Sequence, residues 1–239
     1  MKLALFGNGS MGRVAAALAR ARGHEIGSVL DSRDAGRTPE QLAPLLSGHD
    51  VAIDFSAAAA VLDHVAACVA AGVPLVEGTT GWQAAEGEAR RLVEDGGGAM
   101  VYGANFSIGV NLFYRLVERA GGLFAGLGYD AFIEEAHHAK KRDAPSGTAL
   151  RLRAILAGPV GCELPVASTR AGHIPGVHRV GFDSAADQVV LVHSARSREG
   201  FAEGGLAAAR WIAGAGRRGV YAFADVLDEI LDAERRDNR

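Results

Sequence analysis

Two histidines and three cationic side chains occupy six consecutive positions of the chain, from His137 to Arg142. A Pro-Ser-Gly-Thr turn follows them, and a helix-like run begins at Ala149. Cationic side chains attract anions, and the free backbone amides at the start of a helix are fixed hydrogen-bond donors. The spacing therefore predicts a pocket for a small polyanion.

Three interpretations of this stretch are open. A metal site would need a further ligand, and adjacent histidines on a strand point to opposite faces, so they chelate poorly. A solvated cationic loop would account for Lys140 and Arg142. An anion-binding catalytic site accounts in addition for the histidines, for Lys141 and for the helix start. We adopt this third interpretation and expect no metal.

The second chemical signal is a turn near the N-terminus that matches the pattern G-x-G-x-x-G: Gly7, Asn8, Gly9, Ser10, Met11 and Gly12. In dinucleotide-binding proteins such glycines allow a tight turn, approach of the pyrophosphate to the backbone, and close packing of helix on strand. Here the turn joins an apolar run to a helical run, and Asp31 ends the next apolar run. An ordinary strand-to-helix turn would not require this context, so we predict a dinucleotide site.

Asp31 and Arg33 bear on the choice of coenzyme. The Asp31 carboxylate would accept hydrogen bonds from the adenosine ribose and would repel a 2′-phosphate, which favours NADH. Arg33 could offset that repulsion by pairing with the phosphate, or it could be a solvated loop residue. The sequence therefore predicts NADH, NADPH or both, with a slight preference for NADH or dual use.

Three further segments follow predicted strands, at the edge of the sheet where ligands bind in such folds. They are D-F-S at 54–56, G-T-T-G at 78–81 and G-A-N-F at 103–106. Ordinary strand-to-helix loops would explain each segment singly. Together they could line the nicotinamide–ribose slot, and the residues that we assign to coenzyme binding here are Phe55, Gly78, Thr79, Thr80, Ala104, Asn105 and Phe106.

The elements that must position these residues follow from periodicity. Apolar runs at 2–6, 25–30, 51–55, 74–77 and 100–102 alternate with helical patterns at 13–22, 57–71 and 86–94. This alternation predicts an α/β domain with a doubly wound parallel sheet. After residue 106 the pattern changes to mixed α+β. We expect a helix from 107 to Gly121-Gly122, strands at 131–136 and 188–194, helices at 151–157 and 201–211, a loop-rich stretch at 159–187 and a final helix.

Composition limits the class of protein. The chain has 239 residues, 49% of them hydrophobic, and its formal net charge is −3, whereas nucleic-acid binders are usually basic. Cys68 and Cys162 lack the spacing of a disulfide framework or a zinc site. We recognise neither a signal peptide nor an apolar run of membrane-spanning length. We therefore expect a cytoplasmic protein that binds neither nucleic acid nor membranes.

The stretch E-A-H-H-A-K-K-R-D-A-P-S-G-T-A-L resembles the signature of the dihydrodipicolinate reductase (4-hydroxy-tetrahydrodipicolinate reductase) family, E-x-H-H-x-x-K-x-D-x-P-S-G-T-A, and keeps every fixed position. Supporting matches extend along nearly the whole chain. They include the glycine turn, D-F-S at 54–56, G-T-T-G at 78–81, A-N-F-S-I-G-V-N at 104–111, R-A-G at 170–172, G-V-H at 176–178, and H-S-A and S-R at 193–198.

The resemblance implies NAD(P)H-dependent reduction of a cyclic, unsaturated dicarboxylate to tetrahydrodipicolinate, in diaminopimelate and lysine biosynthesis. It implies a Rossmann domain over 1–106 that is completed by 199–239, and a domain over 107–198 that binds substrate and builds a homotetramer. Lys141 would be the proton donor and His137 its catalytic partner. The residues that would contact the substrate are His138, Lys141, Ser146, Gly147 and Thr148.

Three features depart from the family pattern. Ala139 and Lys140 follow the second histidine, where many members have an arginine, which is expected to alter substrate binding without involving Lys141 or His137. Ser10 stands where many members have an arginine, so one phosphate contact is expected to be missing. The stretch from Asp31 to Asp50 is expected to be too short for the usual elements between the second and third strands. Two rival functions remain open: a related NAD(P)-dependent amino-acid dehydrogenase, and a non-catalytic nucleotide sensor. The intact His-His-x-x-Lys and Pro-Ser-Gly-Thr segments argue against both rivals.

Overall fold

The structure, a computed structural model, describes residues 1–160, 164–214 and 216–237. Cys162 of the sequence analysis and part of the stretch expected to be loop-rich lie outside these residues. The chain divides into two compact units: unit 1 comprises Met1–Ile108 and the chain from Glu199 onward, and unit 2 comprises Gly109–Arg198. No helix among the described residues is long and apolar enough to cross a bilayer.

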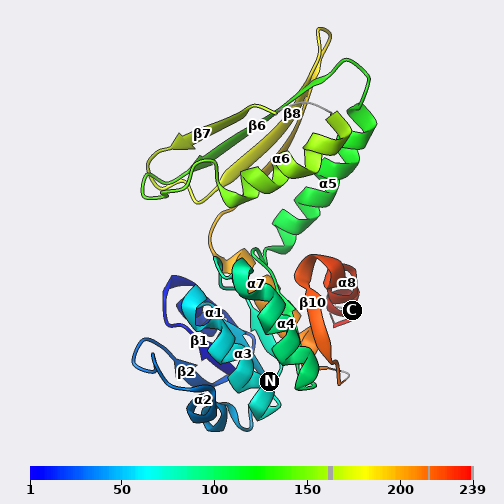
Figure 1. Ribbon diagram of the computed structural model, residues 1–239. Helices are drawn as coiled ribbons and strands as arrows, with labels where there is room; N and C mark the ends of the chain where they lie inside the picture. Colours follow the sequence, from blue (N-terminus) through cyan, green and yellow to red (C-terminus); the bar gives the residue numbers. More distant parts are fainter. Residues whose placement is uncertain (161–163, 215, 238–239) are drawn as a thin grey trace. The chain divides into compact units, whose positions relative to one another are not determined.

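Unit 1 is built on a parallel sheet of six strands with the order β10-β5-β4-β3-β1-β2 (Figure 1). Their bounds are β1 Lys2–Phe6, β2 Glu25–Leu30, β3 Val51–Asp54, β4 Leu75–Glu77, β5 Ala99–Tyr102 and β10 Gly219–Ala222. The inner strands are buried on both faces, which explains why their sequences are continuous apolar runs. All carboxyl ends lie at one edge of the sheet, so the loops that follow β1, β3, β4 and β5 meet there.

Helices cover both faces of this sheet. On one face lie α1 (Ser10–Ala21), α7 (Glu199–Ala213) and α8 (Phe223–Asp237), and on the other α2 (Pro39–Leu46), α3 (Val61–Ala71) and α4 (Glu86–Asp95). Short 3₁₀ turns, Ala58–Ala60 and Gln83–Ala85, precede α3 and α4. Two separate apolar clusters, one on each face, hold the layers together. The Rossmann-like sheet predicted from the alternating pattern is confirmed.

Helix α2 corrects one expectation, because the stretch from Asp31 to Asp50 does carry an element. Pro39 occupies the first helical position, where its fixed φ angle is favourable. The backbone N–H of Thr38 donates to Gln41 Oε1 at 3.0 Å, which is half of a capping box. Leu42 and Leu46 are buried against the sheet. The sequence T-P-E-Q at 38–41 carries the signal for this helix start.

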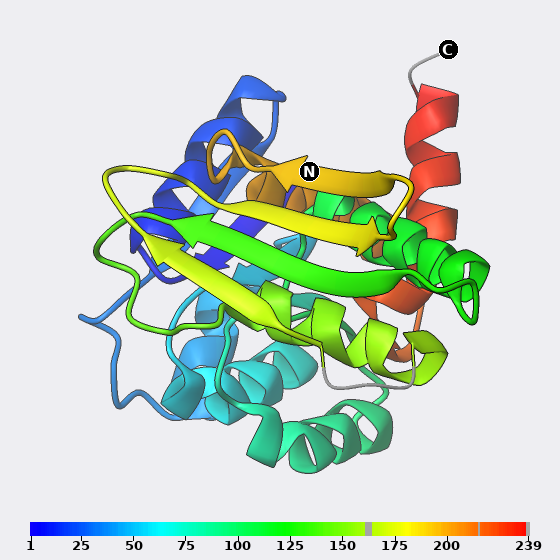
Figure 2. The ribbon, with the colours of Figure 1, turned by 90° about the horizontal axis from the view of Figure 1, so that it is seen from above.

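Unit 2 is a four-stranded sheet of order β7-β6-β8-β9 with two helices on one face (Figures 1 and 2). The bounds are α5 Ile108–Phe124, β6 Asp130–His137, α6 Gly147–Val160, β7 Val166–Arg170, β8 Val177–Asp183 and β9 Gln188–Ser194. Strands β6 and β7 are parallel, and the other pairs are antiparallel. Apolar side chains of α5, α6, β6 and β8 form one core.

Two expectations for unit 2 are wrong. The stretch 159–187 contains β7 and β8, whose apolar alternation is interrupted by polar residues and, in β8, by Gly181. Helix α5 does not end at Gly121-Gly122 but continues to Phe124. A Cβ at Gly121 would lie 2.7 Å from Leu156 Cδ2 on α6, so this glycine lets the two helices approach closely.

Candidate active site

The glycine turn of unit 1 is shaped by close backbone contacts. Gly7 has a φ of +95°, and a Cβ there would lie 2.4 Å from the carbonyl oxygen of Phe55. A Cβ at Gly12 would lie 2.0 Å from the carbonyl oxygen of Gly7. Gly9, in contrast, has open space where a Cβ would stand. The first and third glycines are therefore required by the turn itself, whereas the second leaves room for a ligand, as a pyrophosphate needs.

Helix α1 begins inside this turn, at Ser10, and not at residue 13 as the apolar pattern suggested. Gly9 is its N-cap and makes no side-chain hydrogen bond to the first turn. The first amides of an α-helix have no acceptor within the helix, so the amides of Ser10 and Met11 point out of it. Together with the helix dipole, these donors suit the phosphates of a dinucleotide.

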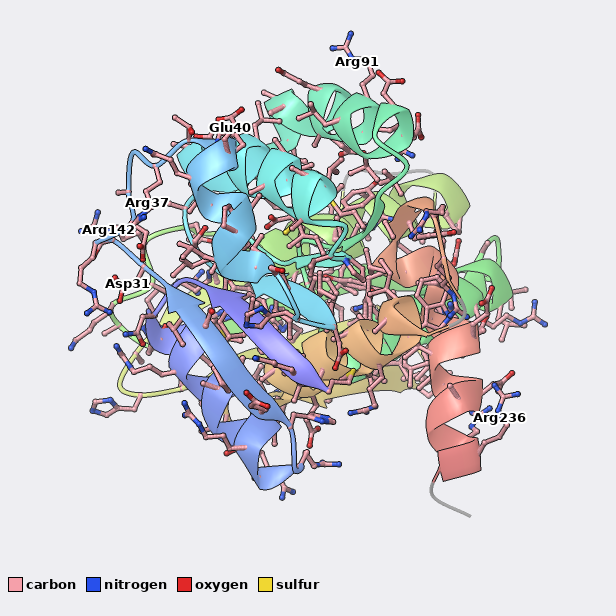
Figure 3. All side chains as sticks on the ribbon, turned by 90° about the horizontal axis from the view of Figure 1, so that it is seen from below. Asp31, Arg37, Glu40, Arg91, Arg142 and Arg236 are labelled. Carbon is pink, nitrogen blue, oxygen red and sulfur yellow. The ribbon has the colours of Figure 1, made fainter. Side chains whose placement is uncertain are left out.

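Asp31 and Arg33 form an ion pair just beyond β2, and Figure 3 labels Asp31 at the end of that strand. Arg33 Nε donates to Asp31 Oδ1 at 2.9 Å, and a terminal nitrogen of Arg33 donates to Oδ2 at 3.0 Å. Asn8 of the glycine turn lies 3.5 Å from the same carboxylate. The Arg33 hydrogen bonds lower the pKa of Asp31 to about 2. A cavity of about 420 Å³ beside α1 is lined by Asn8 and by three arginines, Arg13, Arg20 and Arg33.

The loops after β3, β4 and β5 place the remaining predicted coenzyme residues. Phe55 is half-buried, and its ring lies where a Cβ of Gly78 would stand. Thr79 and Phe106 are buried, and their side chains are therefore part of the protein interior. Asn105 Oδ1 accepts the Ser107 N–H at 2.8 Å. The predicted residues with exposed side chains at this edge are Thr80 and Ala104.

In unit 2, strand β6 ends at His137, and His138 follows it. Its residues alternate between buried and exposed, so that Glu135 and His137 face inward. His138 follows the end of the strand and is only half-buried. Its carbonyl oxygen accepts the Lys141 N–H at 3.0 Å, which closes a turn and brings Lys141 back toward the strand.

Glu135 is the centre of a hydrogen-bond network. Arg170 on β7 binds both of its oxygens, at 2.9 and 2.6 Å, and His137 Nδ1 lies 2.5 Å from Oε2. The Ser146 N–H donates to Oε1 at 3.3 Å. Burial alone would raise the pKa of Glu135, but hydrogen bonds from Arg170, Ser168 and His137 outweigh it and lower the pKa to about 2. Glu135 is therefore ionised at neutral pH.

The ionised Glu135 fixes the state of His137. Because a carboxylate only accepts hydrogen bonds, Nδ1 of His137 carries the hydrogen, and Nε2 is left with its lone pair. Burial lowers the pKa of His137, and the hydrogen bond to Glu135 raises it only in part. His178 on β8 lies beside it, and burial, followed by the charge of His137, lowers the pKa of His178 to about 4. Both imidazoles are therefore neutral at pH 7.

Lys141 is held by Asp143. Its Nζ donates to both carboxylate oxygens, at 2.7 and 2.8 Å, and this contact lowers the pKa of Asp143. Arg170 also donates to the carbonyl oxygen of Asp143 at 2.6 Å, which ties the lysine loop to Glu135. The side chain of Lys141 is 24% exposed, so the ammonium can reach a ligand. In this structure the ion-pair partner of Lys141 is Asp143.

Some polar groups at the start of α6 are buried, and others are exposed. Ser146 is buried, and its Oγ accepts the Ala149 N–H at 3.2 Å and lies 3.0 Å from His178 Nε2. It therefore acts as a helix cap. Gly147 is exposed, and Thr148 is half-buried with its side chain hydrogen-bonded to Tyr114. The amides of Gly147 and Thr148, at the first helical positions, are the donors that face outward.

Glu135, His137 and His178 also have the spacing of a metal site, since one ligand atom of each lies within 4.8 Å of the others. Arg170, however, already binds both oxygens of Glu135. A guanidinium so close would repel a divalent cation. We interpret the group as a hydrogen-bonded support for His137.

Comparison with known proteins identifies the family. Residues 1–106 match the family model described as "Dihydrodipicolinate reductase, N-terminus", and residues 109–227 match "Dihydrodipicolinate reductase, C-terminus". The 4-hydroxy-tetrahydrodipicolinate reductase of Christiangramia forsetii is 34% identical over 97% of this chain and 99% of its own. The chain belongs to the dihydrodipicolinate reductase family. The family predicted from the His-His-x-x-Lys signature is confirmed.

Solved structures support the fold. A dipicolinate-bound dihydrodipicolinate reductase from Paenisporosarcina sp. TG-14 superposes with a TM-score of 0.78 at 20% identity, over 95% of this chain and 99% of that one. An engineered D-amino acid dehydrogenase bound to NADP⁺ superposes with a TM-score of 0.55 at 12% identity, over 94% of this chain and 93% of that one. A nicotinamide coenzyme is thus consistent with the family, with this fold and with the glycine turn.

Sequence reasoning missed three residues of the unit 2 network: Glu135, Arg170 and His178. Each lay within a segment that matches the family, yet none was assigned a role. Glu135 stands two residues before His137 on the same strand, a spacing that puts both side chains on one face. That signal was readable. The partnership with Arg170 depends on the register of β6 against β7, in which His137 pairs with Arg170, and no local pattern shows it.

Proposed function

We propose that this chain is an NAD(P)H-dependent 4-hydroxy-tetrahydrodipicolinate reductase that produces tetrahydrodipicolinate in diaminopimelate and lysine biosynthesis. The observation that carries the proposal is the arrangement at the end of β6. An ionised Glu135 orients a neutral His137, and Arg170 ties the Lys141 loop to the same carboxylate. The exposed start of α6 follows in the chain. We infer that this arrangement serves a dianionic ring that must be protonated, as the family resemblance implies.

Unit 1 would bind the coenzyme. The glycine turn would hold the pyrophosphate on the amides at the start of α1, with Asn8 and Ser10 at its rim, and Asp31 would accept the ribose hydroxyls. The loops after β3, β4 and β5 would bound the nicotinamide half. When bound, the nicotinamide supplies a hydride to the ring, and the negative charge left on the substrate must then be neutralised by a proton.

The ion pair of Asp31 and Arg33 supports dual use of NADH and NADPH. With NADH, Arg33 can remain on the Asp31 carboxylate as it does in this structure. Facing a 2′-phosphate, the 80% exposed Arg33 side chain is free to turn toward the ligand. Arg13 and Arg20 line the neighbouring cavity and add positive charge. We therefore propose that both coenzymes bind and that Arg33 sets the affinity for NADPH.

Lys141 would donate the proton. A lysine ammonium is charged at neutral pH, and the contact with Asp143 holds it near the start of α6. General acid catalysis of this kind contributes roughly 10²–10⁴-fold to a rate. His137 would be its partner. Its Nε2 lone pair can take up the proton that the net reaction consumes from an acid in the solvent, and the neighbouring Glu135 stabilises the imidazolium until that proton has moved on to Lys141.

The substrate carboxylates would bind at the start of α6. The amides of Gly147 and Thr148 are oriented in advance by the helix, which makes them effective donors to an anion. His138 and Lys141 would complete the contacts. We assign Ser146 an indirect role, because its hydroxyl already caps α6 and contacts His178. It would hold the amides in place.

We propose that the chain forms a cytoplasmic homotetramer in which the two units have different roles. Unit 1 would be the dinucleotide-binding domain, and unit 2 would bind substrate and form the subunit contacts. In unit 2, α5 and α6 cover one face of the sheet, whereas Val190 and Val192 of β9 are exposed, at 40% and 52%. Exposed apolar side chains on an uncovered sheet are typical of an interface. Size-exclusion chromatography with light scattering would test for four copies of the 24.8 kDa chain.

The proposed reaction is tested by absorbance at 340 nm, with NADH or NADPH and the freshly made product of the upstream synthase. We expect oxidation of the coenzyme only when that product is present. A related amino-acid dehydrogenase would instead reduce NAD(P)⁺ with an amino acid. Coenzyme binding without oxidation by any of these substrates would favour the nucleotide sensor and would refute our proposal.

A further inference from the structure

Two buried carboxyl groups stand side by side in unit 1, where β3 and β4 end. Asp54 and Glu77 are register partners on these adjacent parallel strands, and both are 0% exposed. Register partners project to the same face of a sheet, so the two side chains are neighbours. Nothing in the proposed reaction uses either of them. Two ionised carboxylates could not coexist in such a place without a large electrostatic cost.

Asp54 is surrounded by hydrogen-bond donors. Its Oδ1 accepts the Ser56 N–H at 2.8 Å and the Thr79 hydroxyl at 3.2 Å, and its Oδ2 lies 2.6 Å from His64 Nδ1. The His64 ring stacks on Phe6 with its centroid 3.9 Å away, which fixes its orientation. A group that accepts from three donors is suited to the ionised form. Asp54 is therefore the charged member of the pair.

Glu77 has the opposite surroundings. Its Oε1 accepts the Thr79 N–H at 2.6 Å, whereas its Oε2 is buried with no acceptor or donor assigned to it among the described residues. Burial, followed by the charge of Asp54, raises the pKa of Glu77 well above its usual range. In the protonated form, Glu77 can donate to Asp54. Its carboxyl group would then have a partner for each oxygen.

The other titratable groups that face the pair do not supply a compensating charge to Glu77. His64 from α3 is bound to Asp54. Cys68, also from α3, is buried, and burial, followed by the charge of Asp54, raises the pKa of its thiol. Tyr102, the register partner of Glu77 on β5, donates its hydroxyl to Glu86. A proton held between the two carboxyl groups therefore limits the negative charge of the pair to one.

We propose that Asp54 and Glu77 share one proton and that the pair holds in position the two loops that flank the nicotinamide half of the coenzyme. Asp54 accepts a hydrogen bond from the Ser56 N–H in the loop after β3, and Glu77 accepts one from the Thr79 N–H in the loop after β4. The Thr79 hydroxyl donates to Asp54 and so connects the two loops. The pair is buried beneath the loops and touches no ligand, so both residues are positioning residues. This inference rests on the proposed function of unit 1 as the coenzyme domain.

The shared proton is tested first by stability, which does not depend on any coenzyme. An unfolded glutamate ionises near pH 4.5, whereas folded Glu77 keeps its proton to higher pH. Folding then retains a proton that unfolding releases, so stability falls as pH rises between the two pKa values. Relative to Glu77→Gln, the unfolding equilibrium constant of the wild type should rise by up to tenfold per pH unit above pH 4.5, until Glu77 also ionises in the folded protein. Glu86→Gln, a substitution of the same type in unit 1, is the control and should follow the wild type.

The positioning role is tested by coenzyme binding, measured by fluorescence titration with NADH. Glutamine can donate to Asp54 and accept from Thr79, so Glu77→Gln should bind NADH like the wild type at pH 6.5. At a higher pH, at which folded Glu77 loses its proton, the wild type should bind more weakly than Glu77→Gln, because the two carboxylates then repel each other. Glu77→Ala should bind about tenfold more weakly at both pH values, since it loses the Thr79 contact.

Two results would overturn the inference. A ratio of wild-type to Glu77→Gln unfolding constants that does not change with pH would mean that no proton is shared. Equal NADH affinity of a folded Glu77→Ala variant and the wild type would mean that the pair does not hold the loops. Should Glu77→Ala not fold, the second point is decided by comparing the NADH affinity of the wild type with that of Glu77→Gln at the two pH values. Equal affinity at both pH values would mean that the pair does not hold the loops. Failure of the wild type to bind any nicotinamide coenzyme would refute the proposed function while leaving the stability result valid.

Discussion

Unit 1 and unit 2 present ligand donors in different ways. At the coenzyme edge of unit 1, the donors are backbone amides, and glycines are required because the turns approach one another closely. In unit 2, charged side chains are fixed by a buried network around Glu135. The difference suggests that substitutions in unit 2 alter chemistry and those in unit 1 alter coenzyme affinity.

The two buried glutamates sharpen this contrast. Glu135 meets Arg170, and its pKa falls to about 2, whereas Glu77 meets Asp54, and its pKa rises. Both side chains are almost wholly buried, so burial alone does not determine the charge. The charge of the neighbouring side chain decides whether each glutamate is ionised.

Removal of the Lys141 ammonium should have the largest effect on turnover. We expect Lys141→Ala to lower kcat by roughly 10²–10⁴-fold, the usual contribution of a general acid, and to leave the dissociation constant for NADH unchanged. Lys140→Ala is the matched control, because Lys140 is the exposed neighbour and should be dispensable. Near-normal turnover of Lys141→Ala would show that the proton comes from another group.

Neutralisation of Glu135 should mainly affect stability and its dependence on pH. Glu135→Gln leaves Arg170 without its anionic partner, and breaking such a buried pair typically costs about 3–5 kcal/mol. The folded pKa of about 2 lies below the unfolded value of 4.5, so the wild type gains stability above pH 4.5 and loses it as pH falls toward 2. Chemical denaturation between pH 3 and 7 would measure both. A variant as stable as the wild type at pH 7 would contradict the network.

A methyl group at Gly12 should weaken coenzyme binding without changing the substrate site. Its Cβ would lie 2.0 Å from the Gly7 carbonyl oxygen, and relief of such a clash typically costs about 1–3 kcal/mol. We expect about a 5- to 150-fold loss of NADH affinity in Gly12→Ala. Gly87→Ala on α4, where a Cβ meets open space, is the control. Equal affinity in the two variants would show that the turn does not bind the dinucleotide.

Loss of Arg33 should have the smallest effect and should separate the two coenzymes. We expect Arg33→Ala to raise KM for NADPH about fivefold, the effect of one exposed ionic contact, and to leave KM for NADH within about twofold. Steady-state kinetics with both coenzymes would measure the difference. Parallel changes for NADH and NADPH would mean that Arg33 does not contact a 2′-phosphate.

The sequence predicted those features that depend on neighbouring residues. The glycine turn, the parallel sheet implied by alternating strands and helices, and the cluster at His137 can all be predicted from the sequence, because their signals are local. Helix α2 was also readable from Thr38, Pro39 and Gln41 and was overlooked. The contact of Arg170 with Glu135 was not readable, since it joins residues 35 positions apart through the register of two strands. The same holds for Asp54 with Glu77.

Two sites in different parts of the chain bind the two ligands, and the chemical shifts of backbone amides can follow each site separately by NMR. Titration with dipicolinate should shift the amides of Gly147 and Thr148 and leave those of residues 7–12 unchanged. Titration with NADH should shift residues 7–12 first. If dipicolinate left Gly147 and Thr148 unchanged, or if both ligands shifted the same set, the account would be contradicted.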